Sequence, residues 1–376
     1  MSKPVTDTTS ETLTISELLE RSAQTGIELQ CDDGSFPQHE TSYYDDRQLP
    51  VRATSQWLRI FVEAYSISGD TKYLHHANEA ASYLISDAVR PHGYTFHCRN
   101  SSGKDKCNGV YGQAMPVWAL TTAAEYLNRN ELYDVAEDVA MCHPYDDYLS
   151  LWHRVEITGD VLTIDRTLNH QLAFAGAIST IDTKKCQRSV IDFLDNLESM
   201  LAPRSDGIIR HFARTPFIHK KSTNIRHKVA ILRNRVLFEA YRYLPSARNK
   251  EISYQAANLF WLAYLKKQFP GHEFWDTEMV NRITEIVQTN KFHTDVKQTD
   301  MAFTASPTGF YIAVALDIFN EDYQNAARWI TEQLNRTFKL DTESLIADVS
   351  DHVKMTSNIC YLAEFSDMDL EITVAK

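Results

Sequence analysis

The chain is poor in glycine and proline, the residues that tight turns and hairpins use most. Only 12 of its 376 residues are glycine and 11 are proline, about 6% together where an average soluble protein has roughly 12%. Glycine alone adopts positive φ without a steric cost, so tight hairpins and phosphate-binding loops consume it. The composition therefore predicts an all-α chain and argues against a large β-sandwich, propeller or barrel.

Apolar residues recur at helical spacing through nearly all of the chain after residue 50. Between residues 52 and 68, for example, Trp57, Leu58, Phe61, Val62 and Tyr65 fall on one helix face. The same pattern predicts twelve helices joined mostly by short loops, at 52–68, 71–88, 110–128, 131–142, 146–158, 164–180, 184–201, 228–244, 246–268, 276–291, 308–320 and 322–337.

A weak repeat indicates that these helices form antiparallel pairs. The segments 61–84, 120–140 and 312–330 each end one helix, turn through a short polar loop and restart with a tyrosine that has an alanine three or four residues later. An open solenoid needs regular loops, whereas alternate junctions here are long and chemically distinctive. We therefore predict a ring of six helical hairpins, an (α/α)6 toroid. We expect residues 1–25 to be a loosely attached polar leader with a short helix at TISELLERSAQ, and residues 26–376 to form one toroid domain.

Net charge and the absence of long apolar runs limit the kinds of partner and the location that we expect. Lys+Arg 38 against Asp+Glu 50 gives a net charge of −12, which disfavours a nucleic-acid partner. No apolar run is long enough to span a membrane and the polar start lacks a secretory signal, so a cytoplasmic protein is expected. The oligomeric state is left open.

We expect no cofactor and no metal. The six cysteines form no CxxC pair and are expected to be reduced, and P-loop, GxSxG and HExxH motifs are absent. The pair His75–His76 is expected to lie at a solvent-exposed helix edge and not to bind a metal, on the expectation that no acidic or cysteine partner joins it as a ligand.

Several motifs carry a family resemblance. The stretches CDDGSFP (31–37), RATSQWL (52–58) and SGDTKYL (68–74) resemble the opening of six-hairpin glycosidase-type toroids. The stretches NGVYGQAM (108–115), TLNHQLAFAGA (167–177) and SPTGFYIAVALDIF (306–319) are similar to the AglQ-like proteins of archaeal glycan-assembly gene clusters. The resemblance implies an (α/α)6 fold acting on carbohydrate, with uronic-acid glycans as a substrate class. It departs at Ala173, where the related pattern carries tryptophan, and is faint in the closing stretch DHVKMTSNICYLAEF.

Three residues are the candidates for catalysis. Asp33 precedes Gly34 at a sharp turn and suits a general acid or base, or else bonds its own turn. His170 interrupts an apolar helix together with Asn169 and Gln171; consecutive side chains are about 100° apart, so at least one faces a cavity and one faces packing. The alternative is an N-cap Asn169 and a core histidine. Tyr111 lies beside two glycines that allow close approach of the backbone.

The candidates for substrate binding are chosen by the chemistry of a sugar or a uronate. Amide and imidazole groups bind hydroxyls or a carboxylate, and a guanidinium matches a carboxylate bidentately. Aromatic rings stack on sugar faces or else pack in the core. The set comprises Arg52, Trp57, Gln113, Asn169, Arg210, His211 and Tyr311.

Three functions remain open at this point, each acting on an oligosaccharide or glycoconjugate. Glycoside hydrolysis is favoured and needs two carboxylates, of which Asp33 is one. The second is a uronate lyase or epimerase with His170 or Tyr111 as the base and Asn169, Gln113 and Arg52 neutralising the carboxylate. The third is a non-catalytic toroid that binds a glycan or a protein. If the proposed site is single, Asp33, Gln113 and His170 should lie within about one sugar ring of each other. If they do not, the single-site hypothesis fails and the binding or scaffolding function gains support.

Overall fold

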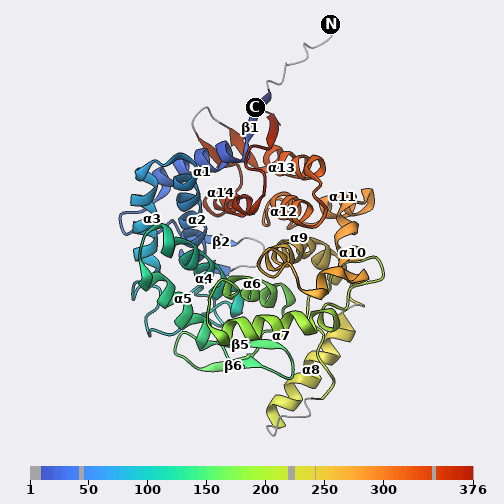
Figure 1. Ribbon diagram of the computed structural model, residues 1–376. Helices are drawn as coiled ribbons and strands as arrows, with labels where there is room; N and C mark the ends of the chain where they lie inside the picture. Colours follow the sequence, from blue (N-terminus) through green and yellow to red (C-terminus); the bar gives the residue numbers. More distant parts are fainter. Residues whose placement is uncertain (1–9, 42–45, 219–224, 242, 341–343, 376) are drawn as a thin grey trace.

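Six inner helices form a closed ring in the computed structural model, which describes residues 10–41, 46–218, 225–241, 243–340 and 344–375. Each inner helix packs against the next, and the last packs against the first. Figure 1 views the ring along its axis. Its members are α2 (Val51–Ser68), α4 (Gly109–Tyr126), α6 (Leu168–Ile178), α9 (Pro245–Gln268), α12 (Thr308–Asn320), and α14 (His352–Ser357) with the 3-10 helix η3 (Asn358–Glu364). The predicted (α/α)6 toroid is confirmed.

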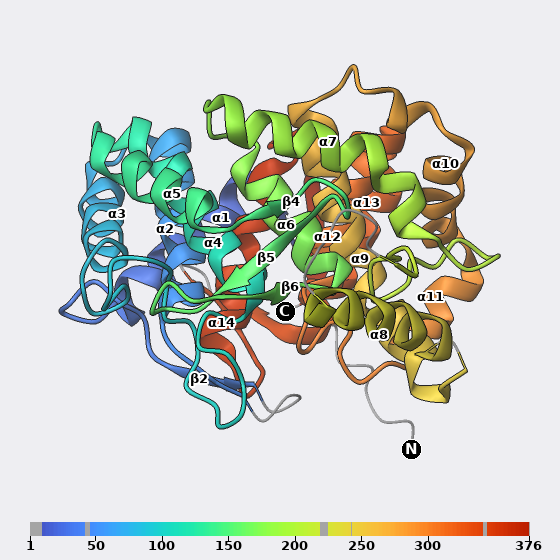
Figure 2. The ribbon, with the colours of Figure 1, turned by 90° about the horizontal axis from the view of Figure 1, so that it is seen from below.

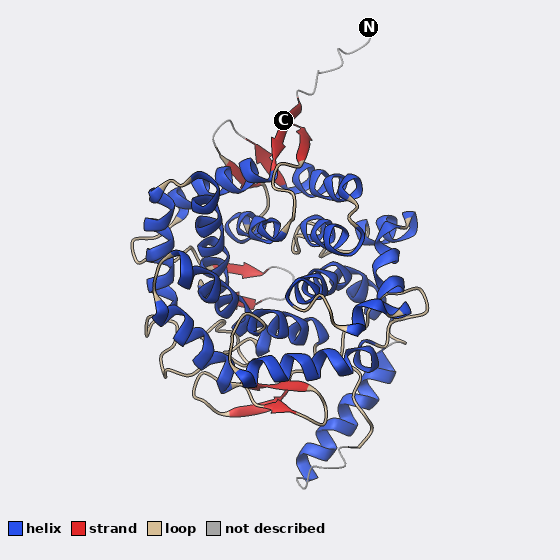
Figure 3. Ribbon diagram, in the orientation of Figure 1, coloured by secondary structure: helices blue, strands red, loops and turns tan. Residues whose placement is uncertain are grey.

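An outer layer of helices surrounds this ring (Figure 3). Each outer helix packs on the inner helix next to it. The outer helices are α3 (Thr71–Leu84), α5 (Asn130–Cys142), α7 (Lys184–Leu201), α10 (Glu278–Glu285) with α11 (Asn290–Lys297), α13 (Tyr323–Thr337) and α1 (Ile15–Leu29). The three repeat segments of the sequence are the α2–α3, α4–α5 and α12–α13 pairs, as expected.

The sixth pair joins the two ends of the chain. α1 packs against α14 and η3, and strand β1 (Ser10–Thr14) pairs antiparallel with β9 (Glu371–Ala375). Thr14 and Glu17 form a capping box that starts α1. Ile15, Leu18 and Leu19 are fully buried in the common core, so this segment is not the loosely attached leader that we expected. Residues 1–9 lie outside the described residues, and the division of the chain at residue 25 stays a prediction.

The inner helices are apolar on nearly every side because they are covered on every side. α4 and α12 bury most of their residues, whereas α7 buries only one face. Close packing between two neighbouring inner helices depends on a glycine of α6. A Cβ on Gly176 of α6 would lie 2.6 Å from Trp261 Cε3 of α9, so only glycine lets these two helices approach this closely.

The helix expected over 146–158 is wrong. This region forms the antiparallel sheet β4 (Tyr145–Asp146), β5 (Leu151–Val155) and β6 (Val161–Ile164), which lies outside α7 in Figure 1. Gly159, at φ +87, turns the chain between β5 and β6. The β-branched and aromatic residues here cover a sheet face instead of a helix stripe.

The helix expected over 276–291 is also interrupted. It is replaced by η1 (Glu273–Asp276), α10, η2 (Ile286–Gln288) and α11. Thr277 and Thr289 cap α10 and α11 by accepting hydrogen bonds from Val280 N and Phe292 N. These two caps divide one apolar pattern into separate short helices.

The remaining elements lie at the rim of the ring. Figure 2 views the toroid from the side and shows β2 near one end and α8 extending beside the three-stranded sheet. Their bounds are β2 (His39–Thr41), β3 (Asp46–Gln48), α8 (Ile225–Tyr241), β7 (Phe338–Leu340) and β8 (Leu345–Ala347). Among the described residues, no helix has the length and apolarity needed to cross a membrane.

Candidate active site

A cavity of about 580 Å³ opens where the inner helices begin. All six inner positions of the ring contribute to its lining, mostly through residues in the first turn of the helix. We call this the central cavity. The contributing residues are Arg52 of α2, Tyr111 of α4, Asn169 and His170 of α6, Lys250 and Tyr254 of α9, Tyr311 of α12 and Lys354 of α14. Because helix N-termini carry partial positive charge, this end of the ring favours an anion.

A second cavity of about 540 Å³ lies beside the first, and we call it the side cavity. It is bounded by the three-stranded sheet and by α8, through residues such as Arg154 and Arg233. Asn108, Arg166 and His170 line both cavities. The two spaces therefore meet at the start of α6.

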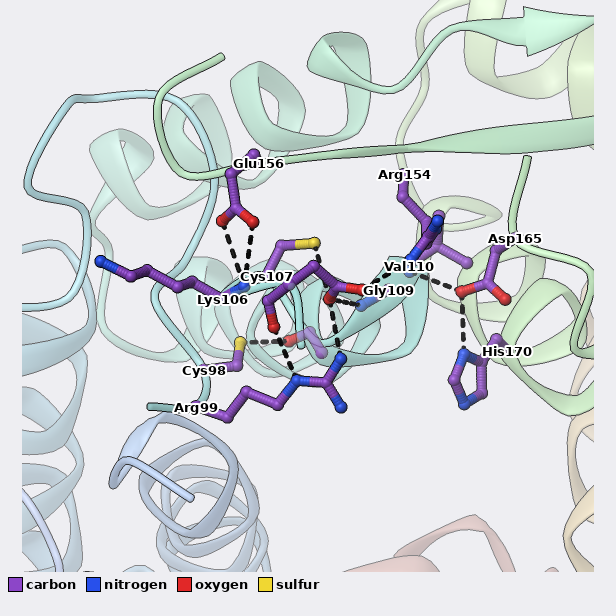
Figure 4. A network of polar contacts seen from close by, with 12 residues as sticks. Cys98, Arg99, Lys106, Cys107, Gly109, Val110, Arg154, Glu156, Asp165 and His170 are labelled. Carbon is purple, nitrogen blue, oxygen red and sulfur yellow. Dashed lines mark hydrogen bonds and ion pairs between the residues drawn. The ribbon is translucent and has the colours of Figure 1, made fainter. Parts of the chain in front are cut away.

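His170 forms a carboxylate–histidine pair with Asp165 at this meeting point (Figure 4). The Nδ1 of His170 lies 2.8 Å from Asp165 Oδ2. Burial alone would raise the pKa of Asp165, but the charge and hydrogen bond of His170 and the Thr167 N–H lower it to about 2. The ionised carboxylate fixes the ring and leaves Nε2 as the nitrogen that can exchange a proton with a ligand.

The start of α4 is built around this pair. Asp165 Oδ2 also accepts the N–H of Val110 at 3.1 Å, and Asp105 accepts the N–H of Gly109 at 2.9 Å. Gly109 has φ +64, and a Cβ there would lie 2.2 Å from Asp165 Oδ2 and 3.0 Å from His170 Nδ1. The glycine of the NGVYG motif therefore makes room for the carboxylate–histidine pair.

Tyr111 and Arg52 extend this group into the central cavity. The Tyr111 ring stacks on the His170 ring, with centroids 5.3 Å apart and planes at 27°. The Arg52 guanidinium carbon lies 5.2 Å from the centre of the Tyr111 ring. The His170 imidazole, the Tyr111 phenol and the Arg52 guanidinium thus follow one another along one wall of the central cavity.

Positive charge dominates the rest of the described lining of the central cavity. Burial, followed by the charge of Arg52, lowers the pKa of Lys354 to about 8, and Asp351 only partly opposes this. Burial and the charge of Arg166 likewise lower the pKa of Lys250. The cationic lining residues are Arg52, Arg99, Lys104, Arg166, Lys250 and Lys354. Mutual repulsion between such buried cations is relieved when an anion binds among them.

Three more predicted residues line the same cavity. Burial and the charge of Lys250 hold the pKa of His211 well below its ordinary value, so this imidazole is neutral near pH 7. Burial holds the pKa of Tyr311 well above its ordinary value, with Tyr361 4.6 Å away between ring centroids. The Oδ1 of Asn169 is buried and has no hydrogen-bond partner among the described residues. These groups offer a neutral donor or acceptor each to a bound sugar.

Six of the ten residues predicted from the sequence thus meet in one cavity: Arg52, Tyr111, Asn169, His170, His211 and Tyr311. Asp33, Trp57, Gln113 and Arg210 are not among its lining. The expectation that Asp33, Gln113 and His170 lie within one sugar ring is therefore wrong, and a different set surrounds His170.

Two of the four are explained by hydrogen bonds that hold the fold. Asp33 is exposed, and its Oδ1 accepts bonds from the N–H and hydroxyl of Ser35, which is the local turn that was its alternative interpretation. Gln113 is fully buried. Its amide bonds both backbone groups of Phe96 and the carbonyl of Cys107, fixing the loop before α4.

The other two pack against aromatic rings. Trp57 is fully buried and stacks on Phe36, with centroids 5.1 Å apart. Arg210 lies over the ring of Phe238 in α8, 4.7 Å from its centre. Ala173, where the related pattern has tryptophan, is fully buried in the core and is not among the residues that line the central cavity.

Sequence reasoning missed Asp165, Lys250 and Lys354. Asp165 precedes α6 in a stretch predicted to be helical, and only its position five residues before His170 could have marked it. Lys354 lies in the closing stretch where the family resemblance is faint. Neither lysine carries a local motif. Lys250 reaches the cavity of His170 because α9 packs on α6, and Lys354 reaches it because the ring closes.

The remaining histidine and cysteine expectations are also resolved. His75 is exposed, as expected, but Glu79 lies 3.4 Å from it and 3.6 Å from His76, so the expectation of no acidic partner is wrong. All six cysteines are free thiols, as expected.

Comparison with known proteins finds one relative by sequence and several proteins of similar fold. No family model matches it. It is 33% identical over 365 residues to archaeal glycosylation protein Q of Haloferax volcanii, covering 95% of this chain and 98% of the relative. Its fold is similar to that of a cellobiose 2-epimerase from Bacillus thermoamylovorans, with a TM-score of 0.61 and 11% identity over 92% of this chain and 97% of the epimerase. An α-1,6-mannanase from Salegentibacter sp. gives a TM-score of 0.54 and 11% identity over 93% and 98%.

Proposed function

Because this chain belongs to the family of archaeal glycosylation protein Q, we propose that it is an enzyme that processes a uronate-bearing glycan in the course of glycosylation. The reaction proposed is removal of the proton at C5 of the uronate, next to its carboxylate, as in uronate lyases and epimerases. The single observation that carries this is the Asp165–His170 pair, 2.8 Å apart, at the wall of a cationic cavity.

The first part of the reaction is binding of the uronate carboxylate. Arg52 and Lys354 come from adjacent inner helices and place two cations in the central cavity. A guanidinium and an ammonium stabilise a carboxylate through charge-assisted hydrogen bonds. They also stabilise the negative charge that moves onto this group when the neighbouring proton leaves.

The second part is proton transfer. His170 Nε2 takes the C5 proton, and the electron pair of the C–H bond moves into the carboxylate to give an enediolate. Asp165 stabilises the imidazolium that forms, because its own carboxylate remains ionised. If the C4 substituent then leaves, the Tyr111 hydroxyl protonates it and the product is a 4,5-unsaturated uronate. If C5 instead takes a proton from solvent water on its other face, the product is the C5 epimer and His170 releases its proton to solvent.

Glycoside hydrolysis, our first expectation from the sequence, is less well supported by the carboxylates present. Asp105 and Asp165 both line the side cavity. Asp105 is bound by Arg99 at 3.0 Å and Arg154 at 2.6 Å, and Asp165 by His170. A hydrolase needs one protonated and one ionised carboxyl group facing the bond. Here two arginines hold Asp105 ionised, and hydrogen bonds from His170 and from two backbone N–H groups hold Asp165 ionised.

The experiment is incubation with neutral and uronate-containing oligosaccharides in deuterated water. Three products are followed together: reducing ends, absorbance of unsaturated uronates and deuterium at C5. We expect unsaturated product or C5 deuterium from uronate substrates only, and a loss of roughly 10³-fold in rate for His170→Gln. His75→Gln, an exposed histidine, is the matched control and should retain full rate.

Other outcomes identify the alternatives. Reducing ends that appear without unsaturated product or C5 deuterium would mean hydrolysis. Tight binding of a uronate glycan with no product from any substrate would mean a binding toroid. Either result would overturn the proposed reaction.

A further inference from the structure

A second group of histidine and carboxylate side chains lies where α8 meets the three-stranded sheet. Asp146 comes from β4, His153 from β5 and His227 from α8. One ligand atom from each lies within 4.8 Å of the other two. The three residues are far apart in the sequence, which is why no spacing motif revealed them.

The contacts of each residue orient it toward the other two. Asp146 Oδ1 accepts the N–H groups of Tyr148 and Leu149, and its Oδ2 lies 3.7 Å from His227 Nε2. His153 Nδ1 lies 2.9 Å from the carbonyl oxygen of Leu162. A histidine that donates one nitrogen to a backbone carbonyl presents the other as a ligand with a fixed ring orientation, as is usual at metal sites.

We propose that Asp146, His153 and His227 bind a divalent transition-metal ion, with zinc as the best match. Two imidazoles and one carboxylate are a ligand set that zinc accepts in tetrahedral geometry, with bonds of about 2.0–2.2 Å. Such bonds place ligand atoms roughly 3.3–3.6 Å apart. The present separations need only small side-chain rotations to reach this. All three residues are partly exposed, so water can take the fourth position.

A bound ion joins α8 to the sheet beside the substrate site. Arg154 follows His153 and Arg226 precedes His227, and both arginines line the side cavity. Val229 and Arg233 of α8 line it as well. The ion therefore fixes the outer wall of the side cavity, and through it the approach to His170, without contacting the reacting atoms.

The test uses the full chain, freed of metal with a chelator and titrated with Co²⁺ and then Zn²⁺. We expect one Co²⁺ per chain with the visible absorption of a tetrahedral site, displaced by Zn²⁺. His153→Ala and His227→Ala should weaken binding by at least about 100-fold, since each removes a ligand. His75→Ala, which removes an exposed histidine beside Glu79, is the matched control and should bind as the wild type does.

A second readout follows α8 directly. Zn²⁺ should slow tryptic cleavage after Arg226, Lys228 and Arg233 in the wild type and in His75→Ala, but not in His153→Ala. Equal binding by all variants, or no stoichiometric binding by the wild type, would overturn the site. Neither readout depends on turnover, so failure here is distinguishable from failure of the proposed reaction.

Discussion

Two turns of this molecule are each organised by an aspartate, but one aspartate only stabilises its own turn and the other lines a cavity. Asp33 stands in the turn between α1 and α2, and Asp165 stands in the segment before α6. Each accepts the N–H of the residue two positions later, at 3.0 Å for Asp33 and 3.1 Å for Asp165. The sequence pattern selected Asp33 and missed Asp165, yet of the two only Asp165 lines one of the two cavities described above.

The difference between the turns is their setting in the ring. Asp33 is exposed and has its hydrogen bonds within its own turn, to Ser35. Asp165 is buried and bonds two other segments, through Val110 N of α4 and His170 of α6. A carboxylate gains a chemical role when burial and a titratable partner hold it in a fixed ionised state, and the turn that carries it does not decide this.

The largest effect should come from exchanging each carboxylate for an amide. Asp165→Asn keeps the shape but cannot stabilise the His170 imidazolium, so we expect kcat to fall by roughly 10²-fold or more. Asp33→Asn leaves the cavity untouched and should change kcat by less than about twofold. Steady-state kinetics of both variants measures this. A similar loss from Asp33→Asn would break the distinction between the two turns.

The glycines of the two regions offer a sharper version of the same test. Gly34 and Gly109 both have positive φ, and a Cβ would lie 2.3 Å from Glu79 O in one and 2.2 Å from Asp165 Oδ2 in the other. Both alanine variants should lose more unfolding free energy than the roughly 1–3 kcal/mol that backbone strain alone costs, because each also adds a collision. Only Gly109→Ala should also lower kcat, by about tenfold or more, because it displaces the catalytic pair.

The control for this pair is Gly103→Ala. Gly103 has φ +75, but no atom lies within 4 Å of the position that an added Cβ would take. It should show backbone strain alone, with normal kcat. Thermal melts of the three variants separate the cost of backbone strain, seen alone in Gly103→Ala, from the added cost of a collision in Gly34→Ala and Gly109→Ala. Kinetics then show whether kcat falls only in Gly109→Ala.

The contrast also explains what the sequence could and could not predict. Helical periodicity located five of the six inner positions, those of α2, α4, α6, α9 and α12, because these helices are strongly apolar, whereas the six-residue α14 lay outside the twelve predicted helices. Asn169–His170 stood out because polar groups interrupt such a pattern. The same reasoning mistook β5 for a helix, since a short apolar stretch suits both. It could not pair α1 with the last helix, because packing between the chain ends leaves no local signal.

The site residues could be predicted only in part, because a polar residue in an apolar helix can either bond the backbone or line a cavity. Gln113 and Asn169 both interrupt apolar helices, yet one satisfies the backbone of Phe96 while the other lines the cavity. Lys354 lies about 240 residues from Tyr111 in the sequence and shares a cavity with it only because the ring closes. Its lowered pKa depends on the surroundings that closure creates, so no spacing rule could reveal it.

Charge in the central cavity distinguishes it further from the exposed turn at Asp33. Arg52→Met should weaken binding of a uronate by about 10–100-fold, the equivalent of one lost charge-assisted hydrogen bond. Arg52→Lys retains the charge and should recover part of this. Binding of a neutral hexose should change little in either variant. Isothermal titration with glucuronate and glucose measures both, and an equal loss for the two sugars would argue against recognition of the carboxylate.

The smallest expected effect concerns pH and the Lys354 ammonium. Its folded-state pKa of about 8 lies below the ordinary lysine value of 10.5, so affinity for a uronate should fall several-fold as pH rises through 8, while Lys354→Met shows no such step. The folded state also binds fewer protons than the unfolded state between pH 8 and 10.5, so wild-type stability should gain a contribution across that window that Lys354→Met lacks. Urea unfolding and glucuronate titration at about pH 7 and about pH 9.5, on either side of the folded-state pKa, test both signs. A pH step that survives in Lys354→Met would assign the titration to another group and remove this lysine from carboxylate binding.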